Sequence, residues 1–195
     1  MAPPARPFIV VLAGVNGSGK SSLGGAMLRG AGLTWFNPDA LAREILAQGG
    51  VSIEEANAHA WQHGRDLLET AIAQRTNHAF ETTLGAHTIP ALLADASRTH
   101  DVMMIFVGLS SPEQHIDRVR WITSRENLIC LLPYLARLQV FDNSIDANLG
   151  EQIPEPVLLL EMVRGRLPYP DPTDAAALAR TPEWARAIVQ AAIEQ

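Results

Sequence analysis

The sequence predicts an α/β fold of three layers, in which helices cover both faces of a central, mostly parallel sheet. Short apolar runs alternate with helical stretches along the chain, and this alternation is typical of βαβ units. The first run, Phe8–Ala13, is continuously apolar and rich in β-branched residues, as expected for a parallel strand buried on both faces. The chain has 195 residues, so we expect a single domain over 1–195.

The remaining elements follow from apolar spacing, caps and turn residues. Helices are expected at residues 22–28, 40–46, 52–74, 88–98 and 112–120. Strands are expected at residues 33–36, 78–81, 102–107, 140–144 and 156–161. Ser52 and Glu55 form a capping-box pattern at the start of the longest helix. Residues 121–138 keep a helical pattern, which Pro133 interrupts.

Both ends of the chain are expected to lie outside this alternation. Residues 1–7 contain three prolines and predict a flexible tail. Residues 168–195 predict a C-terminal extension, in which a proline-rich surface connection over 168–174 precedes a final helix. Thr181 is the expected N-cap of that helix, with Pro182 at its first position.

Composition excludes several classes of protein. The formal net charge of −6 argues against a nonspecific nucleic-acid binder, because the phosphate backbone repels an acidic surface. No apolar run approaches the roughly 20 residues that span a bilayer, so no membrane segment is expected. The start lacks a secretory pattern, which predicts a cytoplasmic location. The single cysteine, Cys130, lies in an apolar stretch and is expected to be a buried small hydrophobe.

The strongest functional motif is Gly14–Ser21, which fits G-x-x-x-x-G-K-[ST] between a predicted strand and a predicted helix. Glycines let backbone N–H groups surround phosphate oxygens, the lysine neutralises them, and the serine hydroxyl binds Mg²⁺. The only lysine of the chain, Lys20, stands at the motif position. The motif predicts a P-loop NTPase that binds a nucleoside triphosphate and Mg²⁺ through Gly14, Asn16, Gly17, Ser18, Gly19, Lys20, Ser21 and Ser22.

Two acidic residues are candidates for deciding where the γ-phosphate goes, because ligands of open α/β sheets bind at the carboxyl ends of strands. Asp39 could accept the proton of an acceptor hydroxyl, or it could cap the following helix. Glu81 could contact the acceptor or hold Mg²⁺. Thr82 and Thr83 could bind a polar substrate or cap the next element.

Positive charge near the transferred group is expected from arginines. Arg118, Arg120 and Arg125 lie close together in the sequence, and the alternative for each is a solvated helix face. His59 and His63 have the i, i+4 spacing of a metal site, but the glutamate of an H-E-x-x-H motif is missing, so we expect no metal there.

Taken together, several motifs resemble the zeta toxin family of P-loop kinases, and the resemblance covers nearly the whole chain. The motifs are Arg6-Pro7, Val11–Ser22, Phe36–Asp39, Phe80–Leu84, Phe141–Ser144 and Thr181–Val189. In one respect the chain departs from the family. Relatives carry a lid-like stretch where Arg120 here runs directly into Trp121, and its loss would weaken phosphate clamping.

The resemblance implies a P-loop kinase that uses ATP and Mg²⁺ to phosphorylate a UDP-activated amino sugar, such as UDP-N-acetylglucosamine. By motif position it implies that Asp39 is the general base, that Glu81 and Thr83 bind the acceptor or support Mg²⁺, and that Arg118 faces the phosphates. It also implies that an antitoxin protein could be a partner.

Three other functions stay open at the level of sequence. The chain could be an ATPase that acts as a regulatory switch, a nucleotide-binding interaction module without turnover, or a kinase of polynucleotide ends, which the acidic charge disfavours.

Overall fold

A computed structural model describes residues 5–30, 33–109, 118–144 and 155–195, with the side chains of 118–120 left out. Its strands are β1 (Phe8–Ala13), β2 (His78–Thr82), β3 (Asp101–Gly108), β4 (Arg137–Asp142), β5 (Val157–Val163) and β6 (Arg166–Tyr169). Its helices are α1 (Lys20–Gly30), α2 (Pro38–Gln48), α3 (Ile53–Gln74), α4 (Thr88–Ala96), α5 (Arg118–Leu131), α6 (Ala175–Ala179) and α7 (Glu183–Ile193), with a 3-10 turn, η2 (Leu132–Tyr134).

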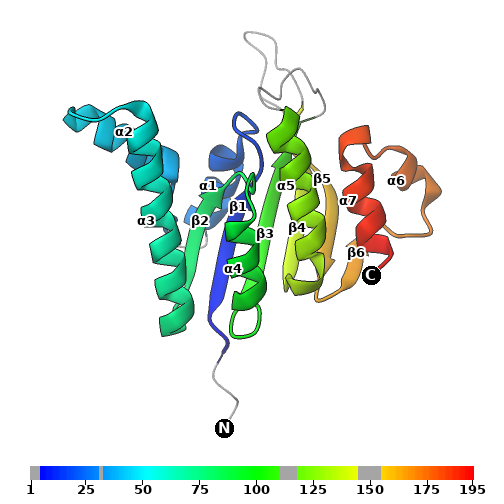
Figure 1. Cartoon of the computed structure of the whole chain (residues 1–195). Coiled ribbons are helices and arrows are strands. Elements are labelled where there is room, and N and C mark those ends of the chain that lie inside the picture. Colours follow the sequence, from blue (N-terminus) through cyan, green and yellow to red (C-terminus); the bar gives the residue numbers. More distant parts are fainter. Residues whose placement is uncertain (1–4, 31–32, 110–117, 145–154) are drawn as a thin grey trace.

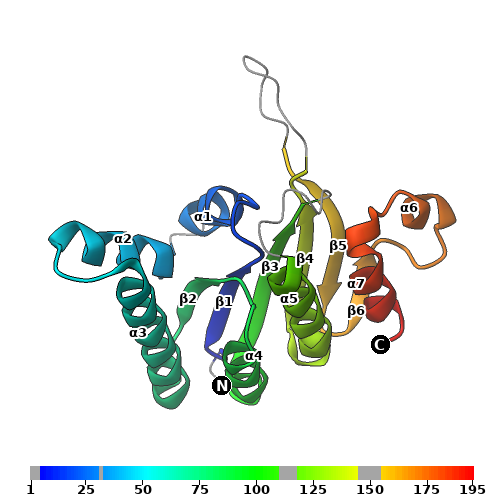
Figure 2. The ribbon, with the colours of Figure 1, turned by 45° about the horizontal axis from the view of Figure 1, so that its top comes forward.

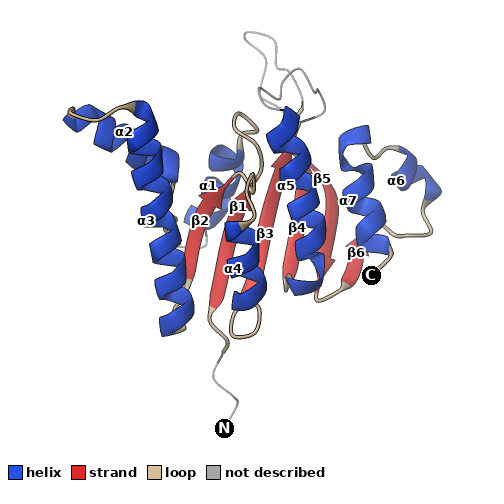
Figure 3. Cartoon of the chain, in the orientation of Figure 1, coloured by secondary structure: helices blue, strands red, loops and turns tan. Residues whose placement is uncertain are grey.

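The described strands form one sheet in the order β2-β1-β3-β4-β5-β6 (Figure 3). The first four of these are parallel, whereas β5 and β6 are antiparallel to their neighbours. The register sets Leu12 of β1 opposite Glu81 of β2. Glu81 is therefore level with the end of β1, where the glycine-rich loop begins.

Helices pack on both faces of the sheet, which confirms the predicted three-layer α/β/α architecture. Ile9, Val11 and Ala13 of β1 point into a large core with residues of α3, α4, α5 and α7. Val10 and Leu12 point the other way, into a smaller core beneath α1. Figure 1 shows α1 behind the sheet and α4, α5 and α7, which contribute to the large core, in front of it. Strand β1 is therefore buried from Ile9 to Ala13, as expected for a strand covered on both faces.

Helices α2 and α3 form a hairpin in which α3 runs beside the edge strand β2 and α2 lies across the first part of α3 (Figure 2). The predicted capping box is confirmed, because Ser52 and Glu55 exchange hydrogen bonds at the start of α3. Ala42 of α2 and Ala56 and Ala60 of α3 form a third small core of their own. The outer part of this hairpin is therefore stabilised by its own apolar contacts.

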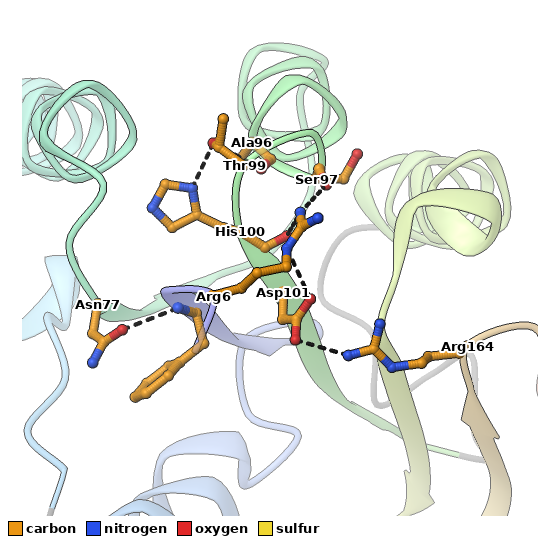
Figure 4. Close-up of polar contacts among 9 residues, drawn as sticks. Arg6, Asn77, Ala96, Ser97, Thr99, His100, Asp101 and Arg164 are labelled. Atoms are coloured by element: carbon orange, nitrogen blue, oxygen red, sulfur yellow. Dashed lines mark hydrogen bonds and ion pairs between the residues drawn. The ribbon is translucent and has the colours of Figure 1, made fainter. Parts of the chain in front are cut away.

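The end of the sheet opposite the glycine-rich loop carries a polar network around Arg6 (Figure 4). The Arg6 guanidinium donates to the carbonyl oxygens of Ser97 at 2.8 Å and His100 at 3.1 Å. Its Nε lies 3.3 Å from Asp101, which also pairs with Arg164 at 2.9 Å. Residues 1–4 of the expected tail lie outside the described part, whereas Arg6 is tied to β3.

Several local expectations are wrong. Residues 33–36 form no strand, and only Phe36 makes an isolated bridge, to Phe80. Helix α5 ends at Leu131 and a strand begins at Arg137, where the helical pattern was expected to reach residue 138. Cys130 is exposed.

The C-terminal expectations also need correction. Strand β6 begins before the expected surface connection and extends to Tyr169, and the short helix α6 was not expected. Pro182, rather than Thr181, is the N-cap of α7. Trp184 of α7 packs in the large core, so the final helix completes the cover of the sheet. None of the helices in the described ranges is long and apolar enough to cross a bilayer.

Candidate phosphate-binding and acceptor site

The loop between β1 and α1 has the backbone of a phosphate cradle. Gly14, Gly17 and Gly19 have φ values of 136°, 81° and 76°, which L side chains rarely adopt. A Cβ atom on Gly14 would collide with the carbonyl oxygen of Val107, so only glycine lets the loop pass this close to β3. The loop leads into the N-terminus of α1, where free N–H groups and the helix dipole favour anions.

The Lys20 side chain folds back over this loop. Its Nζ donates to the carbonyl oxygen of Val15 and to Oδ1 of Asn16, each at 3.4 Å. The residue is 6% exposed, and burial lowers the pKa of Lys20, while the charges of Glu81 and Asp39 act in the opposite direction. Long hydrogen bonds to neutral oxygens satisfy a buried ammonium poorly, so Lys20 is placed to gain from an anion in the loop.

The loop is held from its other side by Asn143, at the end of β4. The Asn143 side chain donates to the carbonyl oxygen of Ser18 at 3.0 Å, and its backbone N–H donates to Gly108 at 3.0 Å. A Cβ atom on Gly19 would collide with the Asn143 amide. Sequence reasoning gave Asn143 no role, although the Phe141–Ser144 motif contains it.

Glu81 is the most constrained acidic residue of the site. It is 3% exposed and accepts three side-chain hydrogen bonds. The donors are the Ser21 hydroxyl at 2.9 Å, the Trp35 indole at 3.2 Å and the Asn37 amide at 3.0 Å. Neither Trp35 nor Asn37 was expected in the site. Their bonds, together with that of Ser21, fix the carboxylate beside the first turn of α1.

Asp39 was expected at the carboxyl end of a strand, but it is the second residue of helix α2. Its side chain is exposed. The N-cap is Asn37, whose Oδ1 accepts from the Ala40 N–H at 3.1 Å. Because Asn37 caps the helix, the Asp39 carboxylate is not needed as the cap.

A groove of about 420 Å³ begins at the loop and runs along α3. Lys20, Asp39, Glu81 and Thr83 all line it, so the structure brings these predicted site residues together. Its α3 wall is formed by Asn57, Ala60, Trp61, Gly64 and Arg65, and its opposite wall by the loop after β2 and the start of α4. A second hollow of about 400 Å³ lies on the other side of Asp39, next to Ser21 and Arg43.

The loop after β2 is held by α5. Ser124 Oγ donates to the carbonyl oxygen of Thr83 at 2.5 Å. Asn127 Nδ2 donates to the carbonyl oxygens of Leu84 at 2.6 Å and Ala86 at 3.2 Å. Leu84 is buried with a φ of 54°, which a leucine tolerates only when its surroundings hold it. These contacts fix the wall that carries Thr83, whose hydroxyl accepts from the Gly85 N–H at 3.4 Å.

The predicted arginines are not brought into the groove among the described side chains. Arg118 begins α5, but its side chain and that of Arg120 lie outside the described part. Arg125 does not line the groove, and its buried Nε finds no hydrogen-bond partner among the described residues.

The residues present fit a nucleotide triphosphate and Mg²⁺. The buried Ser18 Oγ has no described hydrogen-bond partner, and the glycine backbone leaves space for phosphate oxygens above Gly17. Ser21 and Glu81 place a hydroxyl and a carboxylate together at the start of α1. No cluster of three acidic, histidine or cysteine residues suited to a metal occurs in the described ranges. Mg²⁺ commonly needs only one or two protein oxygens besides water and phosphate.

No protein-family model matches the chain, and no curated protein matches it either. Solved structures do match. A structure of the PezAT chromosomal toxin–antitoxin system of Streptococcus pneumoniae shares 15% identity, with a TM-score of 0.54, over 70% of this chain and 68% of that one. A structure of AvrRxo1-ORF1:AvrRxo1-ORF2 with sulphate ions shares 14% identity, with a TM-score of 0.60, over 98% of this chain and 76% of that one.

A further structure of AvrRxo1-ORF1:-ORF2, solved with ATP, shares 13% identity, with a TM-score of 0.60. It is matched over 97% of this chain and 64% of that one, so the chain spans less than two thirds of its length. At such identities the likeness shows a common fold. It supports the three-layer α/β/α fold that the sequence predicts.

Proposed function

We propose that the chain is an ATP-dependent small-molecule kinase, which transfers the γ-phosphoryl group to a hydroxyl of an acceptor bound in the groove. One observation carries the proposal: the phosphate loop opens into a hollow that Lys20 shares with Asp39 and Glu81. Its volume of about 420 Å³ falls within the range of small-molecule sites, roughly 300–1,000 Å³.

The glycine-rich loop would bind the triphosphate through its N–H groups, with Lys20 neutralising the β- and γ-phosphates. Ser21 and Glu81 would hold Mg²⁺, which when bound supplies charge neutralisation to the phosphates. The three hydrogen bonds that Glu81 accepts support this role, because they leave its carboxylate little freedom to follow an acceptor. Thr83, on the wall after β2, would contact the acceptor.

Asp39 is the proposed general base. Its exposed carboxylate lines the groove next to Lys20, and no cap bond occupies it. As the acceptor oxygen bonds to the γ-phosphorus, the bond from that phosphorus to the bridging oxygen of ADP breaks, and Asp39 takes the hydroxyl proton. Arg118 retains the phosphate-facing role that the resemblance implies for it.

The resemblance to zeta toxins favours a UDP-activated amino sugar as the acceptor and cytoplasmic action. An antitoxin-like protein partner fits the same proposal. The PezAT structure is described as a toxin–antitoxin system, and the AvrRxo1 structures contain two different chains.

The test is mass spectrometry of a mixture of UDP-sugars and other nucleotides incubated with the protein, ATP and Mg²⁺. We expect phosphate to be added to one acceptor by the native chain, and no product with Lys20→Ala. Asp39→Asn should abolish transfer while ATP affinity stays within about twofold, because only the proton acceptor is lost. Release of ADP without a phosphorylated acceptor would contradict the proposal and indicate the regulatory ATPase.

A further inference from the structure

The segment before α2 places two side chains on the α1 face of the sheet. Phe36 lies beside β2, because its N–H donates to Ala79 at 2.8 Å and its carbonyl accepts from Glu81 at 2.9 Å. Side chains alternate along extended backbone, so Trp35 and Asn37 share the face opposite to that of Phe36. Accordingly, Phe36 packs against the large core and Trp35 against the smaller core beneath α1. Trp35 and Asn37 thus reach the Glu81 side chain together.

The two oxygens of the Glu81 carboxylate have different partners. Oε2 accepts from the Ser21 hydroxyl at 2.9 Å and from the Asn37 amide at 3.0 Å. Among the described residues, the donor to Oε1 is the Trp35 indole, at 3.2 Å. The terminal torsion of a glutamate has only a weak preference of its own, so its hydrogen bonds decide how the carboxylate is turned. The bond from Trp35 holds one oxygen while the other faces Ser21.

The Trp35 ring is itself fixed by α1. A Cβ atom at Gly25 would collide with this ring, so α1 approaches the indole closely only because a glycine stands there. The Arg29 guanidinium lies 5.4 Å from the ring centre, within range of a cation–π interaction. Ser21, Gly25 and Arg29 are spaced four residues apart and therefore lie along one side of α1. The helix that presents Ser21 to the carboxylate thus also holds the indole that orients it.

We infer that Trp35 is a positioning residue of the proposed metal site: its indole N–H keeps the Glu81 carboxylate turned towards Ser21, and its ring ties that orientation to α1. This inference rests on the metal site that the proposed function assigns, and it adds a residue that acts through Glu81. Removing a hydrogen-bond partner of a metal-supporting group typically weakens metal binding by roughly 10–100-fold.

Two changes at position 35 test the role of the indole N–H. Replacement by 3-benzothienylalanine, in which sulfur takes the place of the N–H, removes the donor and keeps a bicyclic ring against Gly25 and Arg29. Trp35→Phe removes the donor together with part of the ring.

The affinity for Mn²⁺, a paramagnetic substitute for Mg²⁺, is measured by electron paramagnetic resonance with a non-hydrolysable ATP analogue present. Affinity for the same analogue is measured separately in EDTA. We expect both changes at position 35 to weaken Mn²⁺ binding roughly tenfold, while nucleotide affinity without metal stays within about twofold.

Trp184→Phe is the matched control. Trp184 is 7% exposed, but its indole N–H has no hydrogen-bond partner among the described residues. The change removes the same atoms from a packed environment, so both phenylalanine variants should have a lower melting temperature. Only Trp35→Phe should have a lower Mn²⁺ affinity.

Native Mn²⁺ affinity in the benzothienylalanine protein would overturn the inference, and so would an equal loss of affinity in Trp35→Phe and Trp184→Phe. The proposed function is tested separately by phosphoryl transfer. A native chain that binds nucleotide and Mn²⁺ but transfers no phosphate would contradict the proposed function alone, and the comparison at position 35 would still decide the role of Trp35.

Discussion

The Ser21 hydroxyl donates a 2.9 Å hydrogen bond to Glu81, a residue that lies 60 positions further along the chain. The bond joins the first turn of α1 to the edge strand β2. It exists because β2 pairs in parallel with β1 in a register that places Glu81 at the start of the phosphate loop. Strand pairing, rather than sequence proximity, thus creates the proposed metal site.

Glu81→Gln should reduce both stability and transfer. The glutamine amide nitrogen cannot accept the bonds that one Glu81 oxygen receives from Ser21 and Asn37, so buried donors lose a partner. We expect a loss of about 1–3 kcal/mol in the free energy of unfolding, measured by urea denaturation. Transfer should fall roughly 10–100-fold, as expected when a metal-supporting carboxylate is neutralised. Exposed Glu126→Gln is the control, and equal effects of the two changes would contradict the prediction.

The buried lysine gives the chain a specific pH dependence. Burial lowers the pKa of Lys20 in the folded chain below its ordinary value of 10.5. Between the lowered pKa and 10.5, the unfolded chain therefore binds more protons than the folded chain. Stability contributed by this group therefore rises with pH in that window. The unfolding free energy of the native chain should increase relative to Lys20→Met as the pH is raised from 7 towards 10. Urea denaturation of both proteins at each pH measures this difference in unfolding free energy. A difference that does not change with pH would refute the prediction.

Asn127 should stabilise the groove wall. Asn127→Ala removes the donor shared by the Leu84 and Ala86 carbonyl oxygens, and Leu84 has a strained backbone. We expect the free energy of unfolding to fall by about 1–3 kcal/mol. Amide hydrogen exchange should become faster over residues 83–87. Gln62→Ala, which removes the exposed 2.6 Å bond to Asp66, should change stability by less than about 0.5 kcal/mol. Unaltered exchange over 83–87 would show that Asn127 does not hold the loop.

Replacing two glycines of α1 with alanine should have opposite effects on stability. A Cβ atom at Gly24 would overlap the Leu12 side chain, whereas one at Gly30 meets nothing within 4 Å. Gly24→Ala should therefore destabilise the protein by about 1–3 kcal/mol through overpacking, despite the better helix propensity of alanine. Gly30→Ala should keep or raise the melting temperature. If Gly24→Ala proved the more stable of the two, the close approach of α1 to β1 would be wrong.

Features of the structure that depend on residues close together in the sequence could be predicted from the sequence alone. The bounds of β1 and the capping box depend on neighbouring residues, and both were predicted correctly. Residues 33–36 have the β-branched and aromatic character of a strand, but Asn37 and Pro38 start α2 directly after the single bridge at Phe36. Local propensity was therefore overridden by the next helix.

The α3 wall of the groove could not be predicted for a different reason. Trp61 and Arg65 follow a helical pattern that is equally compatible with an ordinary amphipathic helix. Whether they line a groove depends on where α3 lies relative to β2, and the packing of Gly64 on Phe36 fixes that position. The reason for Gly24 and Gly25 likewise lies in the packing of elements and not in the local sequence. Glycine lowers helix propensity, but α1 needs these two small residues to approach Leu12 and Trp35.

The separate alanine core of α2 and α3 has a consequence for how such a protein can change. The glycine-rich loop follows the central strand β1, whereas one wall of the groove belongs to a hairpin with its own internal support. Gly64 must stay small because it packs on Phe36, but Asn57 and Trp61 can change without altering that contact. The fold can thus acquire a different groove wall through substitutions on a peripheral helix, while the glycine-rich loop is kept.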